Sequence, residues 1–171
     1  MYGWSDTMSV NDVTRIDIRQ FLQRQQGERY KAFVIHGPPL ASKTKFARKL
    51  AEISPGGVYL DVLRYVIERP ELAQQIDMID VTALQRLVIL YAINTGARLL
   101  LVDELDFLIP IWSDDLTEFK YMVRSLSVAQ TPAVIGFILQ TRYELEEWNL
   151  PNGANNQNRI LHIENIQALQ P

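Results

Sequence analysis

The chain has 171 residues, of which 47% are hydrophobic and 22% charged, and its formal net charge is -3. This composition is ordinary for a globular domain with one core, and a nucleic-acid contact would need a local basic patch because the whole chain is slightly acidic. The absence of cysteine excludes disulfides and thiolate metal sites, the acids inside the apolar segment 98–112 exclude a membrane helix there, and no secretory leader begins the chain, so we expect a cytoplasmic protein.

The first predicted element is a helix over 10–30. Asn11 or Asp12 would cap its start, and Gly27 would end it. We expect residues 1–29 to form an N-terminal helical segment that precedes the main domain.

Apolar runs and helical spacing alternate through the next part of the chain. The run over 31–37 predicts a buried strand, the spacing over 42–53 predicts an amphipathic helix, and 57–62 predicts a second strand. A broken helical stretch follows over 63–94, and Gly96 would end it. The remaining expected elements are a strand, a helix, a strand, a helical turn and a strand, at 98–104, 114–126, 132–141, 143–148 and 159–166.

This alternation predicts an α/β fold with a five-stranded, mainly parallel sheet. Helices would cover both faces of the sheet, which makes a three-layer sandwich. We expect one main domain over 30–171. Open parallel sheets bind ligands at the carboxyl ends of their strands, so the residues at those ends are the candidates for function.

The run GPPLASKT, residues 37–44, joins the first predicted strand to the helix after it. It resembles the phosphate-binding pattern G-x-x-x-x-G-K-[ST], with Ser42 at the position of the second glycine. Ser42 restricts the backbone more than glycine does, although serine is also a common helix N-cap. In such a loop the backbone N–H groups bind phosphate, Lys43 would neutralise it, and the Thr44 hydroxyl would hold Mg²⁺. The expected nucleotide-binding residues are Gly37, Pro38, Pro39, Leu40, Ala41, Ser42, Lys43 and Thr44.

Two acids, Asp103 and Glu104, end the strongly apolar strand over 98–104. A buried strand that ends in two carboxylates needs a reason, because unpaired buried charge is unfavourable. In P-loop ATPases of the additional-strand class, the strand beside the loop strand ends in this way. The comparison implies that Asp103 is on the metal side and that Glu104 polarises the attacking water. The alternative is that both acids lie in a solvated loop.

The fourth predicted strand ends in polar residues, of which Gln140 or Thr141 would face the γ-phosphate between the loop and the acidic pair. Side chains alternate along a strand, so only one of the two can point at the nucleotide. We take Gln140 as the second catalytic candidate beside Glu104. Arg124 and Arg142 are positional candidates for an arginine that acts on a neighbouring subunit.

Two histidines, His36 and His162, lie in apolar strand contexts. Neither has a metal-binding partner nearby in the sequence. We expect both to be core residues rather than metal ligands.

Together, the loop, the acidic pair and the polar strand end resemble the minimal P-loop ATPase core of AAA and STAND-like proteins, over about residues 30–163. In size and layout the chain is similar to the BrxF family, the small P-loop proteins of BREX phage-defence systems. The resemblance implies a P-loop NTPase sandwich without the C-terminal lid of AAA proteins, ATP and Mg²⁺ as cofactors, and larger protein partners in a bacterial defence complex.

The main interpretation is therefore an ATP-binding, Mg²⁺-dependent slow ATPase or switch subunit, either with larger partners or as a homo-oligomer. One alternative is a nucleotide-binding scaffold with little or no hydrolysis, which Ser42 favours and Glu104 opposes. A small-molecule kinase is disfavoured by the acidic stretch 143–148. A DNA-binding accessory protein would use a basic patch of Arg24, Arg29 and Lys31.

Overall fold

A single parallel sheet lies at the centre of the computed structural model, which describes residues 14–112 and 115–170. The strand order is β2-β3-β4-β1-β5, and every neighbouring pair is parallel. The five-stranded parallel sheet that the alternation predicted is confirmed. The strands are β1 (Phe33–Gly37), β2 (Gly57–Asp61), β3 (Leu99–Asp103), β4 (Val134–Gln140) and β5 (Ile160–His162).

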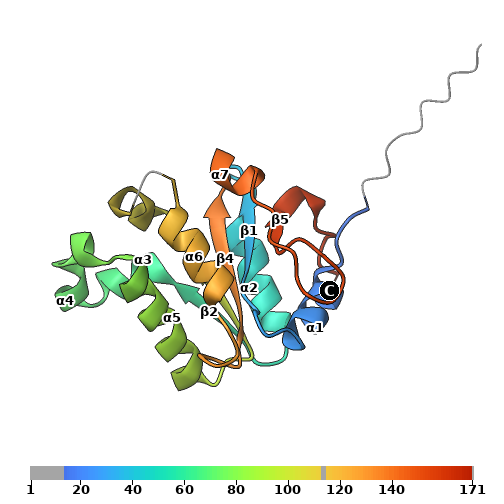
Figure 1. Ribbon diagram of the computed structural model, residues 1–171. Coiled ribbons are helices and arrows are strands. Elements are labelled where there is room, and N and C mark those ends of the chain that lie inside the picture. The colour runs from blue at the N-terminus through green and yellow to red at the C-terminus, as the bar shows by residue number, and fades with distance from the viewer. Residues whose placement is uncertain (1–13, 113–114, 171) are drawn as a thin grey trace, which may run out of the picture.

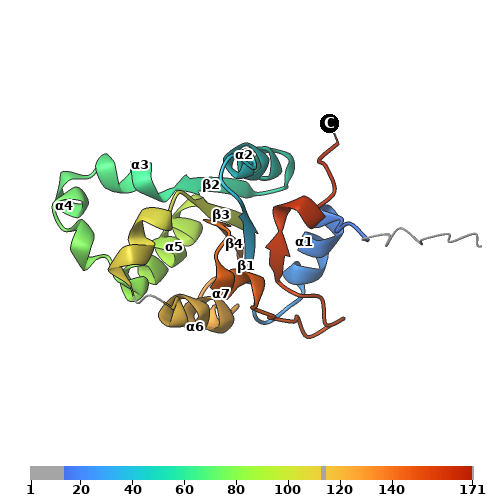
Figure 2. The ribbon, with the colours of Figure 1, turned by 90° about the horizontal axis from the view of Figure 1, so that it is seen from above.

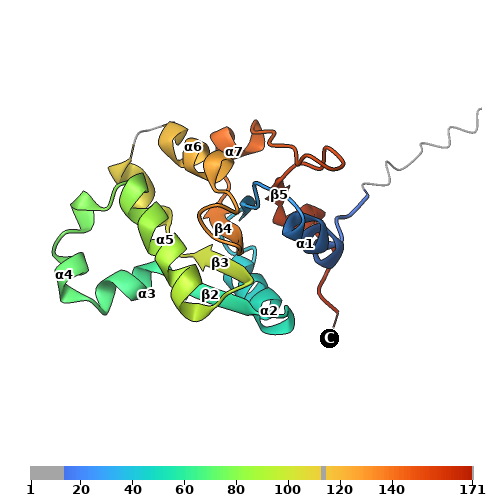
Figure 3. The same cartoon turned by 60° about the horizontal axis from the view of Figure 1, so that its bottom comes forward.

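Helices cover both faces of this sheet (Figure 1). Seen from above, α2 lies on one side of the strands and α6 on the other, and α1 lies next to β5 (Figure 2). The short helices α3 and α4 lie on the side of the molecule opposite α1 (Figure 3). The helices are α1 (Ile18–Gln26), α2 (Lys43–Ile53), α3 (Val62–Ile67), α4 (Pro70–Ala73), α5 (Val81–Thr95), α6 (Thr117–Ser125) and α7 (Tyr143–Glu146).

Alternation along the strands divides the core into two clusters, one on each face. On β1, Phe33 and Ile35 pack with α1 and α2, whereas Val34 packs on the face of α5 and α6. The ring of Phe21 on α1 meets the ring of Phe33 edge-on at 5.3 Å. The α1 helix is therefore packed against the same sheet as the rest of the chain.

The first helix begins later than the sequence predicted. Its N-cap is Asp17, whose carboxylate accepts hydrogen bonds from the backbone N–H groups of Arg19 and Gln20. Helix could not start earlier within the described residues, because Ile16 is in extended backbone and pairs with Ile166. The expected caps Asn11 and Asp12 lie outside the described residues, whereas the predicted end at Gly27 is confirmed.

The sequence comparison had implied that the acid-bearing strand β3 lies beside the loop strand β1, and this prediction is wrong. β4 lies between β1 and β3 and pairs with both of them. All three read as apolar runs, because each is buried on both faces, and such runs do not specify the lateral order of parallel strands.

Within the described part of the chain, no helix combines the length and the apolar character that crossing a bilayer requires.

Candidate functional site

The loop over 37–44 connects β1 to α2 at the carboxyl end of the sheet, as the sequence predicted. Gly37 ends β1 in close contact with the segment that follows β5, because a Cβ at this position would come within 2.5 Å of Cγ2 of Ile163. A larger residue at position 37 would have to displace the side chain of Ile163. Glycine therefore permits the close packing of β1 against Ile163.

Ser42 has left-handed backbone angles, with φ 58° and ψ 31°. This conformation costs a non-glycine residue about 1–2 kcal/mol, which explains why the phosphate-loop pattern has glycine at this place. The hydroxyl of Ser42 makes no capping hydrogen bond to α2. The interpretation of Ser42 as a side-chain N-cap is therefore wrong in this structure. An N-cap residue of that kind has extended backbone, and Ser42 does not.

Replacing Ser42 by glycine is expected to raise the free energy of unfolding by about 0.5–1 kcal/mol, because glycine relieves the left-handed strain but gains unfolded-state entropy. It is also expected to tighten nucleotide binding. Urea unfolding and a titration with ATP and Mg²⁺ measure the two effects. Ser54→Gly at the other end of α2 is the matched control and should destabilise, since Ser54 has φ -90°. Weaker nucleotide binding by Ser42→Gly would show that the hydroxyl itself contributes.

Lys43 begins α2, and its side chain folds back over the loop. Its ammonium donates a hydrogen bond of 2.8 Å to the backbone carbonyl of Pro38. The positive charge is thereby held inside the curve of the loop, next to the first turn of an 11-residue helix. A helix N-terminus and a cation at one place form an environment suited to an anion.

Thr44, one residue further along α2, lies next to both acids at the end of β3. Its hydroxyl is 2.8 Å from Oδ2 of Asp103 and 3.2 Å from Oε1 of Glu104. Asp103 is only 4% exposed, so the alternative that both acids lie in a solvated loop is wrong for Asp103. Three donors compensate this buried carboxylate: the Thr44 hydroxyl, the Tyr59 hydroxyl at 2.9 Å, and the backbone N–H of Glu104 at 2.7 Å.

Strained backbone is concentrated around this cluster. Among the described residues, the non-glycine residues with positive φ are Leu40, Ser42, Glu104, Leu116 and Asn156. The first two lie in the loop, and Glu104, with φ 57°, directly follows Asp103. Strain of this kind persists where the surrounding structure enforces it, and it is frequent at functional sites.

Sequence reasoning missed two residues of the cluster, Tyr59 and Asp106. Burial raises the pKa of the Tyr59 hydroxyl far above its ordinary value, and the charge of Asp103 raises it further. Tyr59 therefore remains a hydrogen-bond donor to Asp103. Its place on β2, inside an apolar run, had indicated only a core residue.

Asp106 lies three residues after Asp103, in the first turn of a short 3-10 helix (Asp106–Ile111). The pKa of its carboxyl is raised above the ordinary value, because burial outweighs the opposing effects of the Gln140 N–H and the charge of Lys43. Its Oδ1 accepts a hydrogen bond of 3.0 Å from that N–H group. Asp106 thus connects the end of β3 to the end of β4. The third acid of the run DELD, residues 103–106, was the signal that could have indicated it.

Gln140 is paired with Gly37 in the register of β4 and β1. It belongs to the alternating set of Val134 and Ile138, which packs on the face of α2. Thr141 serves the opposite face, because its hydroxyl lies 3.0 Å from Nδ1 of His36. Since β4 lies between β1 and β3, its last residue, Gln140, lies between the loop and the acids.

The two histidines pack against each other, with ring centroids 4.9 Å apart at 80°. His36 is 4% exposed, and burial together with the nearby His162 lowers its pKa from 6.5 to about 4. His162 is half-buried, and its Nδ1 accepts a hydrogen bond from the backbone N–H of Glu164. Within the described ranges, no three His, Cys, Asp or Glu side chains form a metal-binding group.

His36 is expected to make the fold sensitive to mild acid. The unfolded chain takes up a proton at the ordinary pKa of 6.5, whereas folded His36 does so only at about 4, so the free energy of unfolding falls as the pH drops between these values. Between pH 7.5 and 5.5 we expect the natural protein to lose about 1 kcal/mol that His36→Gln does not lose. Urea unfolding of both proteins at the two pH values measures this. Equal losses would contradict the assignment to His36.

Arg124 and Arg142 were candidates for acting on a neighbouring subunit rather than on this cluster. Arg142 forms an ion pair of 3.6 Å with Glu144, and Arg124 is exposed in the last turn of α6. The basic patch of the DNA-binding alternative is not complete, because Lys31 is buried and its ammonium donates to the carbonyl of Pro132.

An open hollow of about 580 Å³ lies directly beside the loop. Phe46 from α2 and the apolar residues Ile163, Ile166 and Leu169 near the C-terminus contribute its apolar lining. Arg15, Lys45 and Lys49 add positive charge, and Glu164 adds one negative charge. The loop residue Ser42 lines the same hollow, so a ligand there would be next to Lys43.

The chain was also compared with known protein families, curated proteins and solved structures. No protein-family model matches the sequence, and neither the search of curated proteins nor the search of solved structures found a match.

Proposed function

We propose that this protein is a P-loop protein that binds ATP with Mg²⁺ at residues 37–44 and hydrolyses it slowly. The observation that carries the proposal is the distance of 2.8 Å between the Thr44 hydroxyl and the Asp103 carboxylate, from residues 59 positions apart. Magnesium sites of this kind use one or two protein oxygens beside phosphate and water, so these two oxygens fit the ion. Bound Mg²⁺ would supply positive charge at the phosphates.

Lys43 and the first turn of α2 would bind the phosphates. In the structure the Lys43 ammonium is bonded to the Pro38 carbonyl, and a phosphate oxygen would replace that neutral acceptor with a charged one. Pro38 and Pro39 have no N–H to offer. The donors would therefore come from the later part of the loop and from the start of α2.

The hollow beside the loop would receive the nucleoside. It combines an apolar lining around Phe46 with three cations and one acid, Glu164, and Ser42 belongs both to it and to the loop. A base would pack on the apolar side chains while the phosphates extend toward Lys43. This arrangement supports a nucleotide rather than inorganic phosphate as the ligand.

In hydrolysis, Glu104 would accept a proton from the water that attacks the γ-phosphorus. The bond between that phosphorus and the bridging oxygen breaks, and ADP and phosphate leave. The Asp103 carboxylate is held in place by its three hydrogen-bond donors. Gln140 lies at the end of β4 beside the loop strand, where its side chain would bind the transferred phosphoryl group.

The direct test is the free energy of unfolding of the natural protein in urea, with and without nucleotide. At ten times the dissociation constant, ATP with Mg²⁺ should stabilise the fold by about 1.4 kcal/mol. ATP with excess EDTA should stabilise less, and inorganic phosphate at the same concentration should have little effect. Absence of any shift at millimolar ATP would overturn the proposal.

A scaffold that binds nucleotide without turnover is the second candidate, and the strained Ser42 favours it. Binding without phosphate release in a malachite-green assay would select this candidate. The phage-defence setting and the larger protein partners that the resemblance implies are part of the proposal. The basis for both is the size and layout of the chain.

A further inference from the structure

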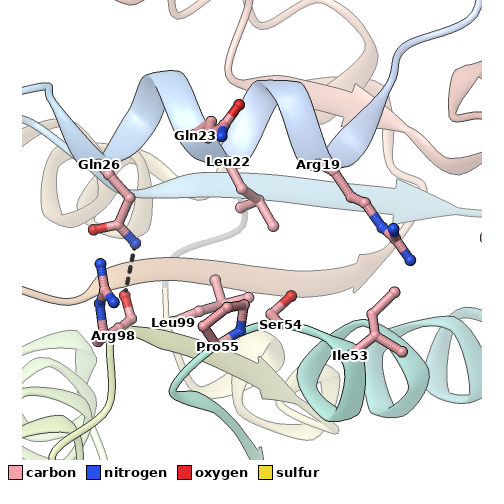
Figure 4. A pocket seen from close by; sticks show the side chains of 9 residues that line it. All are labelled: Arg19, Leu22, Gln23, Gln26, Ile53, Ser54, Pro55, Arg98 and Leu99. Carbon is pink, nitrogen blue, oxygen red and sulfur yellow. Dashed lines mark hydrogen bonds between the residues drawn. The ribbon is translucent and has the colours of Figure 1, made fainter.

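A second hollow, of about 450 Å³, lies at the end of α2 opposite the loop (Figure 4). We call it the α1–α2 groove. It is formed by one face of α1, the turn after α2 and the start of β3. The lining residues are Arg19, Leu22, Gln23, Gln26, Ile53, Ser54, Pro55, Arg98 and Leu99.

The floor of the groove is apolar. Leu22 and Leu99 are 8% and 3% exposed and belong to the core cluster under α1 and α2. Ile53 and Pro55 add apolar surface on the side of α2. An apolar side chain that entered the groove would contact Ile53 and Pro55 above this floor and would therefore leave water in part.

The two ends of the groove are positively charged. Figure 4 shows Arg19 at one end and Arg98 at the other, with Leu22, Leu99 and Pro55 between them. Neither arginine has a carboxylate partner within residues 14–112 and 115–170. Both guanidinium groups can therefore receive carboxylates from another molecule.

We propose that the α1–α2 groove binds an extended acidic segment of a partner protein, with an apolar side chain between two carboxylates. From Arg19 to Gln26 the helix advances about 10 Å, and Gln26 bonds to the Arg98 carbonyl at 3.2 Å. An extended chain covers this length in about three to four residues, and the side chains on one of its faces recur at every second residue. The two carboxylates are therefore four positions apart, with the apolar side chain midway between them on the same face.

The lining favours a peptide over a nucleic acid. No aromatic side chain lines the groove, so unpaired bases would have no stacking surface. The cations lie at opposite ends rather than in a row, and the net charge of the whole chain is -3. Two separated carboxylates match this pattern better than a continuous phosphodiester backbone.

A fluorescein-labelled octapeptide tests the proposal by fluorescence anisotropy. It contains two glutamates four positions apart with a leucine midway between them, and serine and glycine fill the other positions. We expect saturable binding, and Arg19→Gln and Arg98→Gln should each weaken it about fivefold. Arg24→Gln, which removes an exposed charge of α1 outside the groove, is the matched control and should change the affinity less than twofold.

Further measurements identify the occupant. Amide chemical shifts should change around Leu22, Ser54 and Leu99 when the peptide is added, and 0.5 M salt should weaken binding. The proposal is overturned if a peptide with glutamines in place of both glutamates binds equally well, if no binding saturates below 1 mM, or if a single-stranded oligonucleotide binds more tightly. Self-association that Arg19→Gln abolishes would also overturn it, in favour of a second copy. None of these outcomes depends on nucleotide binding.

Discussion

Lys43→Ala is expected to abolish the stabilisation by ATP with Mg²⁺ while it leaves the fold nearly unchanged. In the structure the Lys43 ammonium makes one hydrogen bond, to the Pro38 carbonyl, so its loss should cost the fold no more than about 1 kcal/mol. In the complex the same ammonium would neutralise phosphate. Its removal should weaken ATP binding about a hundredfold, which corresponds to about 2.7 kcal/mol.

Urea unfolding with increasing ATP measures this loss. Arg86→Ala is the matched control, because it removes one exposed positive charge from α5, on the other face of the sheet. We expect it to keep the full response to ATP. If Lys43→Ala retains that response as well, the nucleotide is bound somewhere other than the loop.

Glu104→Gln is expected to keep ATP binding and to reduce turnover about a hundredfold or more. The amide has nearly the same shape and still offers an oxygen to the Thr44 hydroxyl, which lies 3.2 Å from Oε1 of Glu104. It cannot take a proton from water. Phosphate release, compared with that of Glu118→Gln on the exposed side of α6, measures the effect.

Turnover is also expected to depend on assembly, because an arginine from a neighbouring subunit would stabilise charge in the transition state. Specific activity should therefore rise with protein concentration or when a partner is added. A rate that is independent of concentration and survives Glu104→Gln would contradict both the role of Glu104 and the assembly model.

Local sequence patterns were sufficient to predict the helices that bury one apolar face in the core. The α6 helix was predicted from the spacing of its apolar residues, and Phe119, Met122 and Val123 are all buried as expected. Gly96 ends α5 in left-handed backbone because glycine adopts it without strain. In these elements, burial of one face and the needs of a helix end act over a few neighbouring residues, so the sequence itself contains the signal.

The candidate site was predictable only in part. The order of Gly37, Lys43, Thr44 and Asp103 along the chain pointed to one place at the carboxyl ends of the strands. Their contacts did not follow from that order. Nothing in the apolar run of β2 indicated that the Tyr59 hydroxyl would reach Asp103, because the pairing of β2 with β3 is long-range.

By itself, the sequence determined the alternating strands and helices, the parallel sheet and the loop between β1 and α2. Only the tertiary structure decided that β4 lies between β1 and β3, that Lys31 is buried, and that Arg19 and Arg98 flank one groove. The physical reason is the range of the forces involved. Periodic burial and backbone preferences act between neighbours in the chain, whereas strand order and side-chain contacts depend on which distant segments pack together.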